Sequence, residues 1–416
     1  MVRMPRRYAM SGLAVLLSLA GCLAADPVAA RAPAACPGPV RRPAPAPSGT
    51  PWTQQRYDQT RLNALADGRG IVVAVIDSGV DARNAQLQGA VQAGPDQLDG
   101  GSSVLDCVGH GTGVAGIIAA RPVAGSPLRG LAPAATILAL RVSELIEGED
   151  GGATGRPGTP AGLANAIRDA VARHAQVINL SLVSYRDDAV VRDAVRFALD
   201  NDVVVVAAAG NGAEQGNRTP YPAAYDGVIG VGATAPDGQR LPTSQTGPYV
   251  DLVAPGTQIV TTATPDGWTT MDGTSFATPF VAATAALLRQ YRPELTAAQV
   301  SAQLKATADG GRAGPGYGAG LLNPYRALTE HLGASPKPAA QPLAQTARHP
   351  NADRESEARH RTILLALTGL GAVLVAFLIA AVLPRGRRRA WRPGVRELPP
   401  ATAPDPDPTA PAFGGP

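Results

Sequence analysis

An alternation of continuous apolar runs with amphipathic stretches constrains this chain of 416 residues most strongly. The runs IVVAVI (71–76), TILALRV (136–142), VINLSL (177–182), VVVVAAA (203–209) and VIGVGAT (228–234) predict buried strands. The stretches 161–175 and 189–201 have the apolar spacing of helices. Buried strands joined by amphipathic helices predict an α/β fold, in which a mainly parallel sheet is covered by helices on both faces.

The N-terminus has the pattern of a secretory signal over residues 1–25. The basic start MVRMPRRY is followed by the short apolar run AMSGLAVLLSLAGCLAA, which ends in small residues. The tetrapeptide LAGC, ending at Cys22, resembles a bacterial lipoprotein cleavage box, which would place a lipid on that cysteine. Ordinary cleavage after Ala25 or Ala30 would remove Cys22 instead, and both alternatives stay open.

A second apolar segment predicts a single transmembrane helix within residues 361–384. Residues 363–383 carry no charge and would span about 31 Å as a helix, enough for a bilayer core. The basic stretch RGRRRAWR follows, so the positive-inside rule places the C-terminus in the cytoplasm. Signal and helix together predict a cell-membrane protein with its main domain outside the cytoplasm.

The regions between these segments differ in composition. We expect a Pro/Ala-rich extension at 26–60, which is extended and has no core of its own, followed by a main domain at 61–333. A Pro-rich linker at 334–360 and a tail at 385–416, basic and then Pro-rich, flank the apolar segment. The main domain holds 19 Lys and Arg against 25 Asp and Glu, so the whole-chain charge of +4 comes from the ends. This distribution argues against nucleic-acid binding.

Reactive residue types stand where parallel sheets place functional sites, beyond the carboxyl ends of strands. Asp77 follows the first apolar run, and Asn211 follows the run at 203–209. His110 lies in a glycine-framed loop before an apolar stretch, and Ser275 begins a long apolar helix. An Asp, a His and a Ser can serve as orienting group, base and nucleophile.

The segments GIVVAVIDSGVD, GHGTGVAGIIAA, AAAGN and GTSFATPFVAA resemble the aspartate, histidine, oxyanion and serine blocks of subtilisin-like serine proteases, in that family's order. The resemblance implies a subtilisin-like three-layer fold and peptide-bond hydrolysis through an acyl-enzyme. It implies that Ser275 is the nucleophile, His110 the base, Asp77 the orienting carboxylate and Asn211 an oxyanion donor.

The resemblance also implies where an extended substrate binds, with Ser181, Leu182, Val183, Ala208 and Gly210 as substrate-binding residues. Many subtilases have glycine where this chain has Val183, so side-chain bulk narrows the path of the substrate. The loop 143–160, rich in Gly and acidic residues, is either a wall of the cleft or a surface insertion. We expect its acidic side chains to be solvated, and we expect no metal and no cofactor.

The plan of the whole chain resembles the mycosins, membrane-anchored subtilases of actinobacterial type VII secretion systems. This resemblance implies polypeptide substrates and contacts with components of the secretion complex. A mainly structural role in that complex and a general cell-surface subtilase are the alternatives.

The three cysteines give a further prediction. If Cys22 is lipidated or removed, Cys36 and Cys107 remain outside the cell, and we predict that they form a disulfide. It would fix the extension beside the His110 loop and, by closing about 70 residues, stabilise the fold by roughly 4 kcal/mol.

Overall fold

A computed structural model describes residues 44, 46–147, 153–310 and 316–332, together with the single positions 371, 384, 387 and 388. The chain divides into two compact units, Met1–Gly333 and Ala334–Pro416. All helices and strands with assigned bounds belong to the first unit.

The first unit is built on a seven-stranded sheet whose neighbouring strands are all parallel. In spatial order the strands are β2 (Val91–Asp96), β3 (Thr136–Arg141), β1 (Val72–Asp77), β6 (Val177–Leu180), β7 (Val204–Ala208), β8 (Ile229–Thr234) and β9 (Leu252–Pro255). The predicted parallel sheet is therefore confirmed. Because β1 lies between β3 and β6, the strand order reverses beside β1, and a crevice is expected at its carboxyl end.

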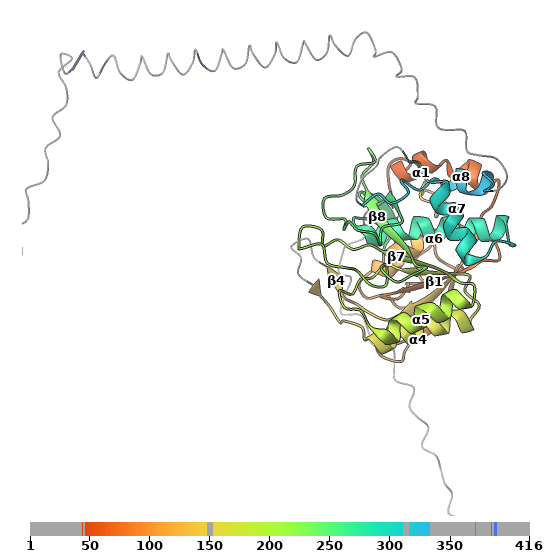
Figure 1. Ribbon diagram of the computed structural model, residues 1–416. Helices are drawn as coiled ribbons and strands as arrows, with labels where there is room; N and C mark the ends of the chain where they lie inside the picture. The colour runs from red at the N-terminus through yellow and green to blue at the C-terminus, as the bar shows by residue number, and fades with distance from the viewer. Residues whose placement is uncertain are drawn as a thin grey trace, which may run out of the picture. The chain divides into compact units, whose positions relative to one another are not determined.

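Helices cover both faces of this sheet (Figure 1). Val73 and Val75 of β1 belong to a core cluster shared with α3 (His110–Ala119) and α6 (Thr274–Tyr291). Ala74 and Ile76 belong to a second cluster, shared with α4 (Pro160–Ala172) and α5 (Ala189–Asp200). Since successive side chains of a strand point to opposite faces, the two clusters are the two interfaces of a three-layer α/β/α fold.

Local sequence explains where the outer helices begin. The Thr159 hydroxyl accepts the Gly162 N–H at the start of α4, and the Asp188 carboxylate accepts the Val190 N–H at the start of α5. On the other face, α7 (Ala297–Ala306) starts with a capping box formed by Thr296 and Gln299. By contrast, neighbouring elements bury α6 on nearly every side. Its sequence is accordingly apolar around most of the helix circumference.

The end of the extension is helical, so the expectation of an extended segment is wrong for residues 52–60. Helices α1 (Trp52–Tyr57) and α2 (Gln59–Asn63) lie there. Tyr57 and Leu62 enter the core of the main domain, where the Tyr57 ring lies 5.8 Å from the Phe280 ring of α6. These two short helices are stabilised by the apolar surface they cover, since five or six residues are too few to be helical alone.

Shorter elements complete the unit. Strand β4 (Ile146–Glu147) pairs with β5 (Ala153–Thr154) in one antiparallel hairpin. Strand β10 (Ile259–Thr262) pairs with β11 (Trp268–Met271) in another. The last helix with assigned bounds is α8 (Pro324–Thr329). The strands β2, β9, β4, β5, β10 and β11 have no counterpart among the sequence predictions. The hairpin β10–β11 packs on α3, the helix that begins with His110: Thr261 and Thr262 donate hydrogen bonds to the carbonyls of Gly113 and Thr112.

Within the described residues, no helix is both long enough and apolar enough to cross a bilayer. The predicted transmembrane segment lies outside the described residues apart from Gly371 and Pro384, and so does the predicted signal at 1–25. Membrane insertion and export therefore stay predictions.

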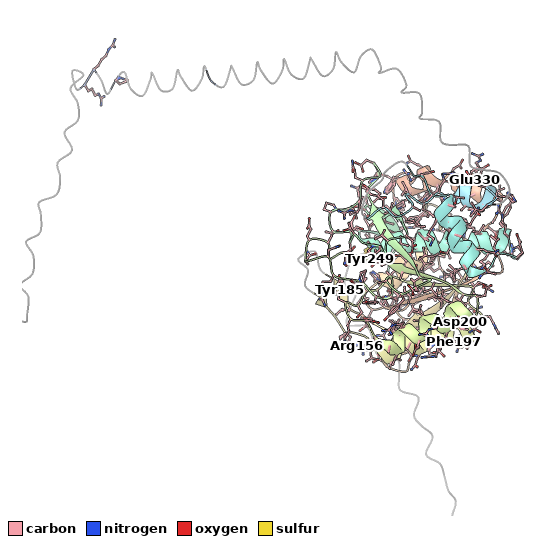
Figure 2. The ribbon with its side chains drawn as sticks, in the orientation of Figure 1. Arg156, Tyr185, Phe197, Asp200, Tyr249 and Glu330 are labelled. Carbon is pink, nitrogen blue, oxygen red and sulfur yellow. The ribbon has the colours of Figure 1, made fainter. Side chains whose placement is uncertain are left out.

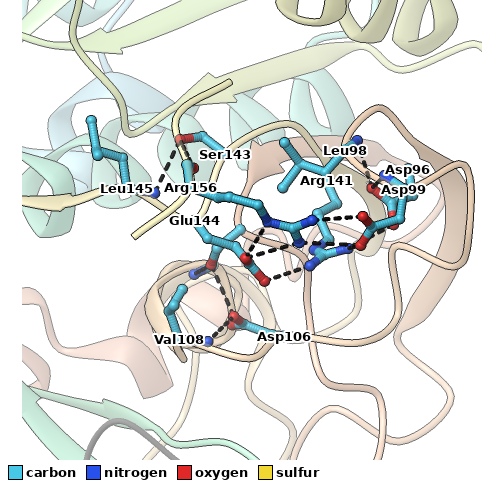
Figure 3. Close-up of polar contacts among 12 residues, drawn as sticks. Asp96, Leu98, Asp99, Asp106, Val108, Arg141, Ser143, Glu144, Leu145 and Arg156 are labelled. Carbon is cyan, nitrogen blue, oxygen red and sulfur yellow. Dashed lines mark hydrogen bonds and ion pairs between the residues drawn. The ribbon is translucent and has the colours of Figure 1, made fainter. Parts of the chain in front are cut away.

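A buried arginine ties the start of the loop 143–160 to the sheet (Figure 3). The Arg141 side chain, at the end of β3, donates to Asp96 at 2.7 Å, to Asp99 at 2.9 Å and to Glu144. Arg156 bonds to Asp99 at 2.6 Å and to Glu144 at 3.0 Å. Hydrogen bonds from Arg156 and then Arg141 lower the pKa of Asp99 to about 2. Glu144 is thus ion-paired, and the expectation of solvated acidic side chains in this loop is wrong for this residue.

Replacing Arg141 by Met should lower the free energy of unfolding by about 3–5 kcal/mol, because the buried carboxylate of Asp96 then has no charged partner. Denaturant titration measures the loss. Arg192→Met is the matched control, since its ion pair with Asp187 is exposed and should contribute little. An equally small effect of both substitutions would contradict this account of the network.

Candidate active site

Asp77 and His110 meet at the carboxyl end of β1. Nδ1 of His110, the first residue of α3, lies 2.7 Å from Oδ1 of Asp77, and the aspartate is buried. A hydrogen bond from Nδ1–H to the carboxylate leaves the lone pair of the neutral imidazole on Nε2. The arrangement therefore creates a base with a fixed tautomer and orientation.

Glycine allows this close approach of strand and helix. A Cβ on Gly111 would lie 2.1 Å from the carbonyl oxygen of Gly79, so α3 could not come this near to the turn after β1. Gly109, immediately before His110, has a φ of +83°, in the left-handed region that side chains disfavour. The glycine frame of the sequence motif thus has a direct steric role.

Ser275 lies at the second position of α6, beside the end of β6. Its hydroxyl donates to the carbonyl oxygen of Ser181 at 3.2 Å, and the Ser181 hydroxyl donates to the Ser275 carbonyl at 2.7 Å. The ring of Phe276, the next residue, packs on the His110 ring with centroids 5.0 Å apart. The structure therefore brings Ser275 and the Asp77–His110 pair to one region.

Asn211 is oriented by the residue before Ser275. Its Oδ1 accepts the Thr274 N–H at 2.9 Å and the Thr274 hydroxyl at 3.1 Å. Because Oδ1 is occupied, the Nδ2 amide is the group left to donate toward a ligand. Gly273 has a φ of +120°, and a Cβ there would lie 3.1 Å from Nδ2, so glycine keeps the space beside this amide open.

The predicted substrate-binding segments follow two neighbouring strands. Ser181 to Val183 come after β6, and Ala208 ends β7, with Leu180 and Ala207 paired in register. Ser181 bonds to Ser275, and the Gly210 N–H donates to the Thr274 hydroxyl at 3.1 Å. Both segments therefore border the start of α6, and Val183 is half-buried at the end of its segment.

A tyrosine packs beside the second of these segments. The Tyr185 hydroxyl (Figure 2) lies 2.9 Å from Oε1 of Gln245, beyond Val183 along the chain. A Cβ on Gly210 would lie 2.1 Å from the same oxygen, and one on Gly212 would lie 2.8 Å from the tyrosine hydroxyl. The two glycines thus make room for the Tyr185–Gln245 pair.

Sequence reasoning missed a buried polar group behind the histidine. Asp106, four residues before His110, is only 1% exposed, and burial raises the pKa of its carboxyl to about 6. Its position inside the histidine motif was the available signal, but its burial could not be read from the sequence.

Cys107 follows Asp106 in the same loop and is disulfide-bonded. Its partner lies outside the described residues, as does Cys36, so the pairing of Cys36 with Cys107 stays a prediction. In the described part of the chain, no group of three His, Cys, Asp or Glu side chains is arranged to hold a metal ion.

Comparisons with known proteins indicate the family of this chain. The model of the subtilase family (Peptidase_S8) matches residues 68–326. Thermitase of Thermoactinomyces vulgaris is 34% identical over 289 residues, which are 68% of this chain and 99% of thermitase. Subtilisin BL of Lederbergia lenta is 37% identical over 274 residues, which are 66% of this chain and 96% of that protein.

Solved structures of mycosins are similar as well. MycP3 protease from the type VII (ESX-3) secretion system aligns with a TM-score of 0.58 and 30% identity, over 69% of this chain and 91% of MycP3. MycP1 from Mycobacterium smegmatis aligns with a TM-score of 0.59 and 28% identity, over 72% of this chain and 91% of MycP1. The chain therefore belongs to the subtilase family and is a subtilisin-like serine endopeptidase.

Proposed function

We propose that this endopeptidase cleaves extracytoplasmic polypeptides with an Asp77–His110–Ser275 triad, and that it is anchored in the membrane beside a type VII secretion complex. The observation that carries the catalytic part is the 2.7 Å contact between Asp77 and His110 at the start of α3. Ser275 begins α6, whose next residue packs on the same imidazole. This arrangement fits the roles that the motifs imply.

Each step of the proposed reaction uses one of these groups. Ser275 Oγ bonds to the peptide carbonyl carbon while Nε2 of His110 accepts the hydroxyl proton. The C–N bond then breaks, and the leaving amine takes this proton from His110. Water, deprotonated by His110, attacks the resulting ester, and Ser275 recovers its proton as the acid product leaves. Asp77 stabilises the imidazolium in both halves and does not itself accept the proton.

The developing oxyanion is expected to bind two donors, the Asn211 side-chain amide and the Ser275 backbone N–H. Thr274 holds the amide in the orientation that this role needs. The positive end of the α6 dipole adds to the stabilisation, because Ser275 lies in the first turn of an 18-residue helix.

An extended substrate is expected to pair with the backbone of Ser181 to Val183 as an added strand. Its backbone would run along this segment, beside the Ala208–Gly210 segment, and both segments border the start of α6. The isopropyl group of Val183 would reduce the width of this path, which favours substrates with small side chains where they cross it.

Three arguments support the secretion context. The domain is similar to mycosin structures over about 70% of the chain. An export signal and a membrane helix are predicted from the sequence, and Cys107 forms a disulfide, as expected of an exported protein. We propose that Cys36 is the partner and fixes the extension beside the His110 loop.

Ser275→Ala should lower peptide hydrolysis by more than about 1000-fold, because alanine has no hydroxyl to attack the carbonyl. Hydrolysis of a peptide library by the purified full chain measures this. Ser301→Ala, on the outer helix α7, is the matched control and should retain wild-type activity.

The same variant separates proteolysis from a scaffold role in a deletion strain. We expect Ser275→Ala to leave the cleavage of secreted proteins unrestored, whereas the wild type restores it. Restored secretion by Ser275→Ala, together with failure of a chain lacking 361–416, would favour the mainly structural alternative.

Asn211→Ala should lower kcat about 100- to 1000-fold with little change in KM, because the amide acts on the oxyanion and not on the resting substrate. Steady-state kinetics with a fluorogenic peptide measures both constants. Asn201→Ala, at the exposed end of α5, serves as control. A rise in KM with an unchanged kcat would contradict the assigned role.

A further inference from the structure

The carboxylate of Asp106 accepts hydrogen bonds from five donors. Its Oδ1 accepts from the Ser78 hydroxyl at 2.9 Å, the Val108 N–H at 3.1 Å and the Gly109 N–H at 2.8 Å. Its Oδ2 accepts from the N–H and the hydroxyl of Thr112 at 2.8 and 2.6 Å. Figure 3 shows the bond to Val108. Both oxygens of the carboxylate therefore accept hydrogen bonds from groups within the protein.

All five donors belong to the two segments that carry Asp77 and His110. Ser78 follows Asp77, and its N–H donates to Oδ1 of Asp77 at 2.7 Å, the same oxygen that contacts His110. The Ser78 hydroxyl in turn accepts the Gly111 N–H at 2.9 Å. Ser78 thus connects Asp106, Asp77 and the first turn of α3, so a shift of Asp106 would shift both partners of the 2.7 Å contact.

Only neutral groups donate to Asp106, so its charge is not cancelled by an ion pair within this network. The titratable groups around it are Asp77, reached through Ser78, His110 on the same loop, and Asp81. The Asp81 N–H donates to the Thr112 hydroxyl at 2.9 Å, and the Asp81 carboxylate is paired with Arg83.

Burial is the main cause that raises the pKa of Asp106 to about 6. Hydrogen bonds from Thr112 and Gly109 lower this pKa, and the negative charge of Asp77 raises it further. Asp106 is therefore negative above about pH 6. A negative charge at this place favours a positive imidazole ring.

We propose that Asp106 is a positioning residue for peptide hydrolysis, which holds Ser78 and the His110 loop in place and whose charge favours the imidazolium formed on His110. The inference rests on the proposed triad and adds a second carboxyl group, outside it, that acts through the base. Protonation of Asp106 removes both effects, so reactivity falls as the pH drops through about 6, together with protonation of His110 itself.

The test measures the second-order rate constant with which a fluorophosphonate labels Ser275 in the full chain, at a series of pH values. The rate constant is expressed per site that becomes labelled. Only folded, reactive protein contributes to this rate. Asp106→Asn keeps the shape and removes the charge, and should lower the plateau rate at least about 10-fold. It should also move the acid midpoint to lower pH by roughly half a unit or more, because His110 loses a negative neighbour.

Two variants separate charge, position and stability. Ser78→Ala removes the connection and keeps the charge, so the plateau should fall about 3- to 10-fold. The midpoint should not move to lower pH, because losing a donor raises the pKa of Asp106. Asp96→Asn, a buried carboxylate paired with Arg141 and outside this network, should destabilise the fold and leave the midpoint in place.

The proposal would be overturned if Asp106→Asn had the wild-type labelling rate and midpoint. It would also be overturned if Asp106→Asn and Asp96→Asn lowered the plateau rate equally and neither shifted the midpoint. If Asp106→Asn does not fold, an unchanged rate for Ser78→Ala overturns it. Labelling of Ser275→Ala at the wild-type rate would instead contradict the triad, which keeps the two failures distinct.

Discussion

The hydrogen bond between Asp77 and His110 sets the strictest requirement on this fold. It joins the end of a central strand to the first residue of a helix, so β1 and α3 must meet within hydrogen-bonding distance. Gly111 makes this approach sterically feasible, and the hairpin β10–β11 packs on α3 through hydrogen bonds from Thr261 and Thr262. The apolar clusters on the two faces of the sheet fix β1 itself. The packing that forms the core therefore also positions the site.

Much of the fold could be predicted because its central strands are continuous apolar runs. The predicted ranges 71–76 and 136–142 agree with β1 and β3 to within one residue at each end. The strand β2 was missed because it lies at an edge, is only partly buried and contains Gly94 and Pro95, which interrupt any apolar pattern. The helices α1 and α2 were missed because packing on the domain, and not a local periodicity, makes them helical.

The site divides in the same way. Asp77, His110, Asn211 and Ser275 stand in motifs that imply their roles, and the structure brings Asp77 next to His110 and Asn211 next to the residue before Ser275. Asp106 escaped notice because its burial depends on partners such as Ser78 and Thr112 that only the fold brings near. The stretch 161–175, predicted from its apolar spacing, agrees with the start of α4 to within one residue and ends three residues too late.

The position of covalent labelling tests the central claim, that Ser275 is activated by the Asp77–His110 pair. The native full chain would be treated with a fluorophosphonate, digested and examined by peptide mass mapping, beside an Asp77→Ala variant and a denatured sample. We expect the label on Ser275 of the native wild type, at least about 100-fold slower labelling of Asp77→Ala and none after denaturation. A label on another residue, or equal labelling of Ser275 in the Asp77→Ala variant, would contradict this account.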